Sequence, residues 1–127
     1  MLNFECRIMG RREDNVVLMK SKDFAVRIVR LYQYLSSVKH EHVMSKQLLR
    51  CGTSIGANLH EAQESISPKE FEAKIYVALK EARETAYWLE LLCKTDYIDT
   101  PQYVSISADS NELIRLLVSI TKSLRSQ

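Results

Sequence analysis

The chain has 127 residues, of which 46% are hydrophobic and 27% are charged, and its formal net charge at pH 7 is +2. This length fits one domain with a hydrophobic core and leaves little room for two. Two prolines and three glycines exclude a collagen-like or low-complexity chain. No apolar run approaches the roughly 18 residues of a membrane span, and the three cysteines are odd in number with no CxxC spacing, as in a reducing compartment. We therefore expect a cytoplasmic protein without a membrane segment.

The basic residues are concentrated in the first part of the chain. Residues 1–50 carry ten Lys or Arg against five Asp or Glu, whereas residues 51–127 carry eight against eleven. This asymmetry is compatible with contact with a polyanion. A balanced surface of salt bridges produces the same counts, so both interpretations remain open.

Residues 1–20 show no clear hydrophobic period, and we expect them to form an N-terminal arm. From Ser21, apolar residues recur at spacings of three and four, which predicts a first amphipathic helix that ends near His40. A second helix is predicted from Ser45 to about Ser65. Its apolar positions keep a four-three rhythm through Leu48, Gly52, Ile55, Leu59 and Ala62.

The clearest helix start in the chain is Ser67, which is followed by Pro68 and, three residues after Ser67, by Glu70. A third helix is predicted from Pro68 to Lys94, then a loop over residues 95–108, and a fourth helix from there to near residue 125. No segment is predicted to be a strand. The sequence therefore predicts an all-α fold, an antiparallel up-down-up-down four-helix bundle over residues 21–127.

Two of the three glycines, Gly52 and Gly56, lie four residues apart inside the second predicted helix. Each glycine costs a helix interior roughly 1 kcal/mol relative to alanine. A pair on one face is therefore expected where a neighbouring helix backbone comes close.

The segment from Tyr87 to Cys93 is apolar nearly all round, with one charged residue in seven. Such a helix should be covered on more than one side. A second subunit is the simplest cover. The alternative is that the predicted loop over residues 95–108 folds back over Trp88 and Leu91.

We find no pattern for catalysis, metal binding or cofactor binding in the sequence. No ExxH pair and no glycine-rich phosphate loop is present. Ser54 has Asn58 and Glu61 on adjacent turns but no histidine in the right register to act as a base. We therefore predict no catalytic residue, no metal and no cofactor, and expect a protein that is not an enzyme.

The same polar residues are better interpreted as a polar seam beside the apolar stripe of the second helix. We assign Ser54, Asn58 and Glu61 to it, and expect side chains of the third helix to meet them. The candidates on that helix are Lys80, Arg83 and Glu84. Such contacts would fix the register between the two helices.

Four basic residues are candidates for nucleic-acid contacts: Arg27, Arg30, Lys46 and Arg50. The first two share one side of the first helix, and the other two are one turn apart on the second. Together they would form a patch for phosphates. Ordinary solvation explains each of them singly.

The second and third helices carry a family pattern: an R-x-x-x-S-I-x-x-N-x-x-E run, a serine-initiated helix with an acidic-Phe pair, and an E-x-x-x-W/Q-L close. The chain resembles, on this pattern, the bacterial four-helix-bundle family of 23S ribosomal RNA intervening-sequence proteins. The resemblance covers about residues 21–125. The matching residues are Arg50, Ser54, Ile55, Asn58, Glu61, Ser67, Glu70, Phe71, Glu84, Trp88 and Leu89.

The resemblance also extends to the accessory proteins of diversity-generating retroelements, and it implies a homo-oligomer, with five copies as the expected number, and nucleic-acid binding. It brings no catalytic residues with it. We therefore expect a non-enzymatic oligomeric bundle that engages RNA or a ribonucleoprotein. The alternative is a protein-protein interaction scaffold without a nucleic-acid role. A continuous positive face would favour RNA, and an apolar groove would favour a protein partner.

Overall fold

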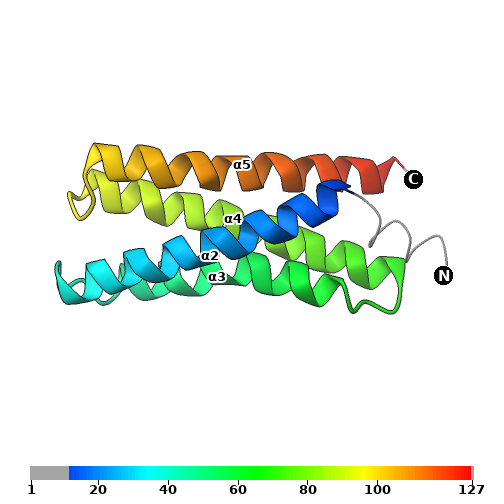
Figure 1. Cartoon of the computed structure of the whole chain (residues 1–127), viewed down its shortest axis with the longest axis horizontal. Helices are drawn as coiled ribbons and strands as arrows, with labels where there is room; N and C mark the ends of the chain where they lie inside the picture. The colour runs from blue at the N-terminus through cyan, green and yellow to red at the C-terminus, as the bar shows by residue number, and fades with distance from the viewer. Residues whose placement is uncertain (1–11, 127) are drawn as a thin grey trace.

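The computed structural model describes residues 12–126 and confirms an all-α, antiparallel four-helix bundle (Figure 1). The helices are α2 (Arg12–Ser37), α3 (Met44–Ala62), α4 (Pro68–Lys94) and α5 (Thr100–Arg125). Each helix packs against the next one along the chain, and α2 closes the bundle against α5. The described residues contain no strand, and none of their helices is long and apolar enough to cross a membrane.

The interface between α2 and α5 is the least extensive of the four helix contacts. Ion pairs join these two helices at Lys20–Glu112, with 3.1 Å between Nζ and Oε1, and at Arg27–Asp109, with 2.6 Å between Nη1 and Oδ2. In Figure 1 the two helices separate toward the C-terminal end of α2. The bundle is consequently more open at that end of this face.

The predicted apolar stripes form one continuous core. Ile28, Leu35, Leu48 and Ile55 have no exposed surface, and they pack with apolar residues of α4 and α5. Val38 lies just after the end of α2 at Ser37, short of the predicted helix end near His40, and it is exposed.

The first helix begins earlier than predicted. The expected arm over residues 1–20 is wrong for residues 12–20, which are the first turns of α2, while residues 1–11 lie outside the described part. Val17 is buried and continues the stripe of Phe24 one heptad earlier. Between them, the buried position of the helix is occupied by Ser21, which is polar but has no exposed surface. The serine interrupts the run of apolar residues in the sequence, although the buried face of the helix continues through it.

The predicted loop over residues 95–108 is also wrong, because α5 begins at Thr100. Asp99 caps this helix: its Oδ1 accepts from the Gln102 backbone N–H at 2.8 Å, and Gln102 Oε1 accepts from the Asp99 N–H at 2.8 Å. Pro101 lies in the first turn, where a proline is well tolerated. The connection is therefore short, and its Ile98 side chain is buried in the core.

The two glycines let α2 approach α3, each in a different way. A Cβ atom on Gly52 would lie 2.8 Å from both Cγ atoms of Ile28, which is a side-chain contact and not the predicted backbone contact. A Cβ atom on Gly56 would lie 3.4 Å from the backbone oxygen of Ser21, as predicted, and 3.3 Å from its hydroxyl. Gly52 is thus the more restrictive of the two positions.

Candidate functional site

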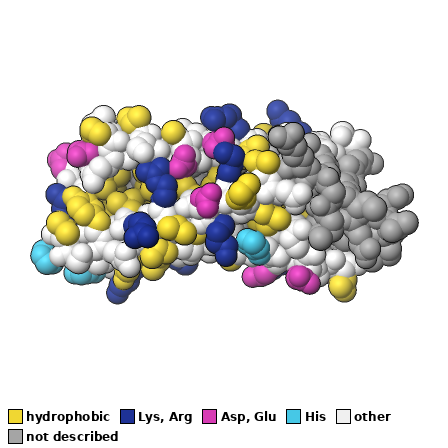
Figure 2. All heavy atoms as spheres, viewed as in Figure 1, with side chains coloured by type: hydrophobic (Ala, Val, Ile, Leu, Met, Phe, Trp, Pro, Cys, Tyr) yellow, Lys and Arg dark blue, Asp and Glu magenta, His cyan; other side chains and the backbone are white. Residues whose placement is uncertain are grey.

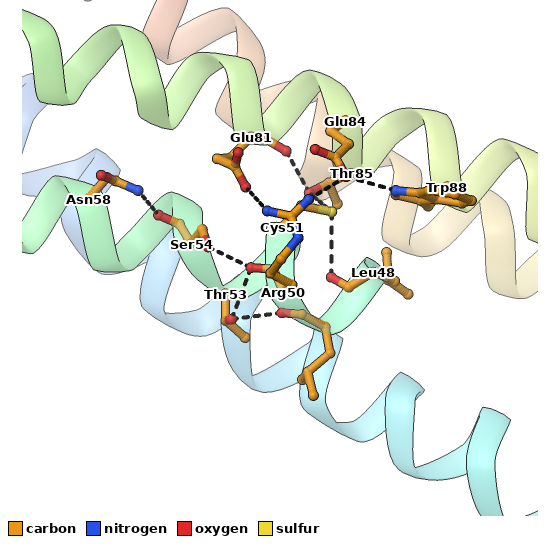
Figure 3. Close-up of polar contacts among 11 residues, drawn as sticks. Leu48, Arg50, Cys51, Thr53, Ser54, Asn58, Glu81, Glu84, Thr85 and Trp88 are labelled. Atoms are coloured by element: carbon orange, nitrogen blue, oxygen red, sulfur yellow. Dashed lines mark hydrogen bonds and ion pairs between the residues drawn. The ribbon is translucent and has the colours of Figure 1, made fainter. Parts of the chain in front are cut away.

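A network of polar side chains lies between α3 and α4, and its centre is Arg50 (Figure 3). The two terminal nitrogens of this guanidinium bind different carboxylates: Nη1 lies 3.0 Å from Glu81 Oε2, and Nη2 binds Glu84 Oε2. Glu84 Oε2 also accepts a hydrogen bond from Trp88 Nε1 at 3.0 Å. One arginine of α3 therefore holds two consecutive turns of α4 and, through Glu84, orients a tryptophan.

The charges of this network are stabilised by their neighbours. The hydrogen bond from Trp88, followed by that from Arg50, lowers the pKa of Glu84 below its ordinary value. The hydrogen bond to Glu84 raises the pKa of Arg50. Both groups are consequently ionised at neutral pH, and the network works as a fixed electrostatic clasp and not as an acid-base pair.

The three α3 residues predicted to form the polar seam differ in what they contact. Ser54 Oγ donates to the backbone oxygen of Arg50 at 2.6 Å, and Asn58 Nδ2 donates to the backbone oxygen of Ser54 at 2.8 Å. These two side chains therefore bond within their own helix. Glu61 reaches α4, where its Oε1 lies 2.6 Å from Lys74 Nζ. Lys74 was not among the predicted partners.

Below the clasp, a thiol lies in the core. Cys51 is fully buried, its Sγ accepts from Thr85 Oγ1 at 3.3 Å, and burial raises the pKa of the thiol. A buried, neutral thiol is a poor nucleophile. Among residues 12–126, no three His, Cys, Asp or Glu side chains lie close enough together to hold a metal ion.

The four predicted nucleic-acid contacts fall into two groups. Arg27 and Arg50 are bound to carboxylates, Arg27 to Asp109 and Arg50 to the clasp, although half of the Arg50 side chain stays exposed. Arg30 and Lys46 are exposed, and neither has an ion pair within the described residues. Figure 2 shows Lys and Arg side chains interleaved with hydrophobic and with Asp and Glu side chains on the face that α2 crosses.

The register of the helices aligns several basic residues. Gly52 lies against Ile28, which places Arg30 level with Arg50 across the antiparallel pair α2 and α3. Arg50 in turn binds Glu84, which places it level with Arg83 of α4. One arginine from each of three consecutive helices therefore lies at the same height of the bundle, a relation that sequence spacing alone does not reveal.

An open groove of about 600 Å³ lies where α2 and α5 separate. Its apolar lining comes from Leu31 and Tyr34 of α2 and from Ile98 and Ile106 on the other side, and Arg27 and Arg30 are among its polar lining residues. The groove has no acidic lining residue. It is therefore an apolar surface with positive charge beside it.

The chain matches the family described as 23S rRNA-intervening sequence protein over residues 13–119, and it therefore belongs to that family. It is also similar to the crystal structure of a protein of unknown function from the S23 ribosomal protein family of Bacteroides thetaiotaomicron. The two chains are 57% identical, the TM-score is 0.85, and the similarity covers 87% of this chain and 98% of the other. No curated protein matches the chain.

Proposed function

We propose that this protein is a non-enzymatic, homo-oligomeric bundle that binds RNA through its phosphates. The observation that carries the proposal is that Arg30 of α2 and Arg83 of α4, which are exposed and have no ion pair within the described residues, lie at one height on the two helices that flank α3. Lys46 lies one turn from Arg50 on α3 and is exposed. A polyanion that crosses these helices at this height meets the guanidinium groups of Arg30 on α2 and Arg83 on α4 and the ammonium group of Lys46 on α3, and arginine binds phosphate by bidentate hydrogen bonds.

The surrounding charge supports the same proposal. Residues 15–60 contain seven Lys or Arg and two acidic residues, Asp23 and Glu41. Three of the seven, Lys20, Arg27 and Arg50, pair with carboxylates of α4 or α5, which leaves Lys22, Arg30, Lys39 and Lys46. Glu41 is buried and accepts hydrogen bonds from the first backbone N–H groups of α3, with 2.7 Å from Ser45 N to Glu41 Oε1. Its charge is therefore turned toward a helix N-terminus and does little to cancel the positive field of α2 and α3.

Self-association is the second part of the proposal. α2 exposes an apolar strip consisting of Met19, Val26 and Val29, which lie on the side opposite its buried stripe. By contrast, Leu89 and Leu92 of the segment predicted to meet a second subunit are buried within the chain itself. We propose that copies associate in the five-membered ring that the resemblance implies, with the α2 strip as one of the two surfaces in each contact, and that Arg30 stays exposed at the rim.

Charge reversal tests the RNA proposal. The double variant R30E/K46E should bind short RNAs of unrelated sequence uniformly more weakly, because phosphate contacts carry no sequence information. The matched control is R115E/K122E, which makes the same change in net charge at two exposed positions of α5. Equal loss of binding in both variants would show that RNA binding depends only on net charge, and it would refute the proposed binding surface.

Light scattering tests self-association. Wild-type protein should have a mass that is a multiple of 14.7 kDa. V26E should dissociate, since a charge at an apolar interface core is poorly tolerated. V77E is the control, because Val77 lies on α4 and is exposed to a similar extent. A wild-type mass of one chain at micromolar concentration would refute this part.

The apolar groove between α2 and α5 supports one alternative, a protein-interaction scaffold without a nucleic-acid role. A groove lined by Leu31, Tyr34 and Ile106 is the type of surface that receives an apolar helix face. The same RNA measurements separate the two functions. Absence of RNA binding by the wild-type protein at low salt would favour the scaffold.

A further inference from the structure

The outward face of α4 presents two tyrosines with two basic residues between them. Tyr76, Lys80, Arg83 and Tyr87 follow one another at spacings of four, three and four, so they share one side of the helix. All four are exposed, and the two tyrosines are 37% and 61% exposed, respectively. At 1.5 Å per residue, the rings are about 16 Å apart along the axis. We call these four residues the α4 strip.

The clasp between α3 and α4 leaves the α4 strip positive. Between its two tyrosines, α4 carries two acidic residues, Glu81 and Glu84, and Arg50 of α3 binds both. Lys80 and Arg83 have no ion pair within the described residues. One turn beyond the strip, Glu90 is engaged with Lys94, 3.7 Å away. The cations of the strip are thus available to a ligand, while Glu81, Glu84 and Glu90 already have partners; Glu72, one turn before Tyr76, is the remaining carboxylate on this side of α4.

The clasp also fixes one of the two rings. Tyr87 packs edge-on against Trp88, with ring centroids 5.2 Å apart and an interplanar angle of 78°. Trp88 is held in turn by its hydrogen bond to Glu84. The Tyr87 ring is therefore supported from one side while most of its surface faces solvent, which lowers the conformational entropy lost when a flat ligand stacks on it.

We infer that the α4 strip binds single-stranded RNA, with unpaired bases stacked on Tyr76 and Tyr87 and phosphates bound by Lys80 and Arg83. Stacking platforms combined with basic groups are the usual means of holding a single strand. This inference rests on the proposed RNA-binding function and names the strand type and the surface.

A second copy of the chain fits this face less well than RNA does. In a symmetric contact through the same face, Lys80 and Arg83 of one copy would approach those of the other, and like charges at an interface are destabilising. A single strand has the opposite charge, and each of its bases offers a flat face to an aromatic ring. Charge complementarity therefore selects RNA as the occupant.

The test uses the full chain and two fluorescently labelled probes, a short single-stranded oligoadenylate and an RNA hairpin of equal length that is fully paired. Wild-type protein should prefer the single strand. Y76A/Y87A should lower the affinity for the oligoadenylate by roughly tenfold or more, and Y76F/Y87F, which keeps both rings, should restore it. V77A is the control for loss of apolar surface beside the strip, and its affinity should equal that of the wild type.

Trp88 gives a second readout, because it is the only tryptophan in the chain. A base that stacks on Tyr87 changes the environment of the adjacent indole, so the oligoadenylate should alter the tryptophan emission more than the paired hairpin does. Y87A should abolish that difference. Identical emission changes with both probes would contradict stacking at this position.

The outcomes separate this inference from the proposed function. If Y76A/Y87A binds the oligoadenylate as the wild type does while R30E/K46E loses affinity, RNA binding stands and the α4 strip is wrong. If Y76A/Y87A instead changes the mass in light scattering and not the affinity, the face is a contact between copies, and the inference fails. If wild-type protein binds neither probe, the proposed function fails as well.

Discussion

Replacing each helix glycine by alanine tests how closely α2 packs on α3. Both substitutions remove the intrinsic helix penalty of glycine, about 1 kcal/mol, so this contribution cancels when the two variants are compared. What remains is the space for one methyl group at each position. A Cβ atom on Gly52 would meet both Cγ atoms of Ile28 at 2.8 Å, whereas at Gly56 the nearest atom, Ser21 Oγ, lies at 3.3 Å.

The environment decides how much these contacts cost. Ile28 has no exposed surface, so it cannot move away without disturbing the core, and overpacking of this kind costs about 1 to 3 kcal/mol. At Gly56 a shift of a few tenths of an ångström is enough. G56A should therefore be as stable as the wild type or more stable by up to about 1 kcal/mol, and G52A should be about 1 to 3 kcal/mol less stable than G56A.

Urea unfolding followed by circular dichroism measures the difference, at one protein concentration because association also contributes to stability. Combining G52A with I28A supplies an internal check, since removal of the Cγ atoms should abolish the penalty at Gly52. G52A that is at least as stable as G56A would refute the packing argument.

Two further predictions concern charged groups at helix contacts. Burial alone would raise the pKa of Glu41, but hydrogen bonds from Ser45, Met44 and Val43 lower it below its ordinary value of 4.5. The ionised carboxylate therefore contributes stability that is complete above about pH 4.5 and is lost as the pH falls through the lowered folded-state pKa. E41Q should be about 1 to 2 kcal/mol less stable at pH 7, and a gap that does not narrow in acid would contradict this role. A double-mutant cycle of R50Q and E84Q should give a coupling of about 0.5 to 1 kcal/mol at low salt, because both groups are partly exposed; a coupling unchanged in high salt would contradict an electrostatic clasp.

How far the sequence predicts the fold depends on where each helix begins. α4 begins where predicted because Ser67 and Pro68 form a local start signal that tertiary packing does not override, and its last residue, Lys94, also agrees with the prediction. In a sequence, a proline such as Pro101 is compatible with a loop and with the first turn of a helix. The hydrogen bonds between Asp99 and Gln102 show that here it lies in the first turn of α5. At the N-terminus, the helix start was predicted too late because the buried residue Ser21 is polar and interrupts the apolar pattern from Val17 to Phe24.

The site is less predictable because it depends on axial register. The sequence shows that Glu61 lies at the edge of the α3 stripe, but not whether Lys74 or Lys80 faces it. That choice follows from how far α3 and α4 slide past one another. The same register brings Arg50 to Glu84 and aligns Arg50 with Arg83. Arg50 was named from the sequence as a nucleic-acid candidate and Glu84 as a candidate partner of the polar seam, but neither the contact between them nor the part played by Glu81 was predicted.

Salt-dependent RNA binding by the wild-type protein tests the central claim most directly. Each neutralised phosphate of a single strand contributes a slope of about −0.7 to log Kobs against log salt. Contacts from Arg30, Lys46 and Arg83 alone therefore predict a slope of about −2, and steeper if several copies bind one RNA. We expect binding at low salt that weakens along this line, regardless of RNA sequence. Absence of any binding at low salt and roughly ten micromolar protein, the range of ordinary non-specific binding, would contradict the account.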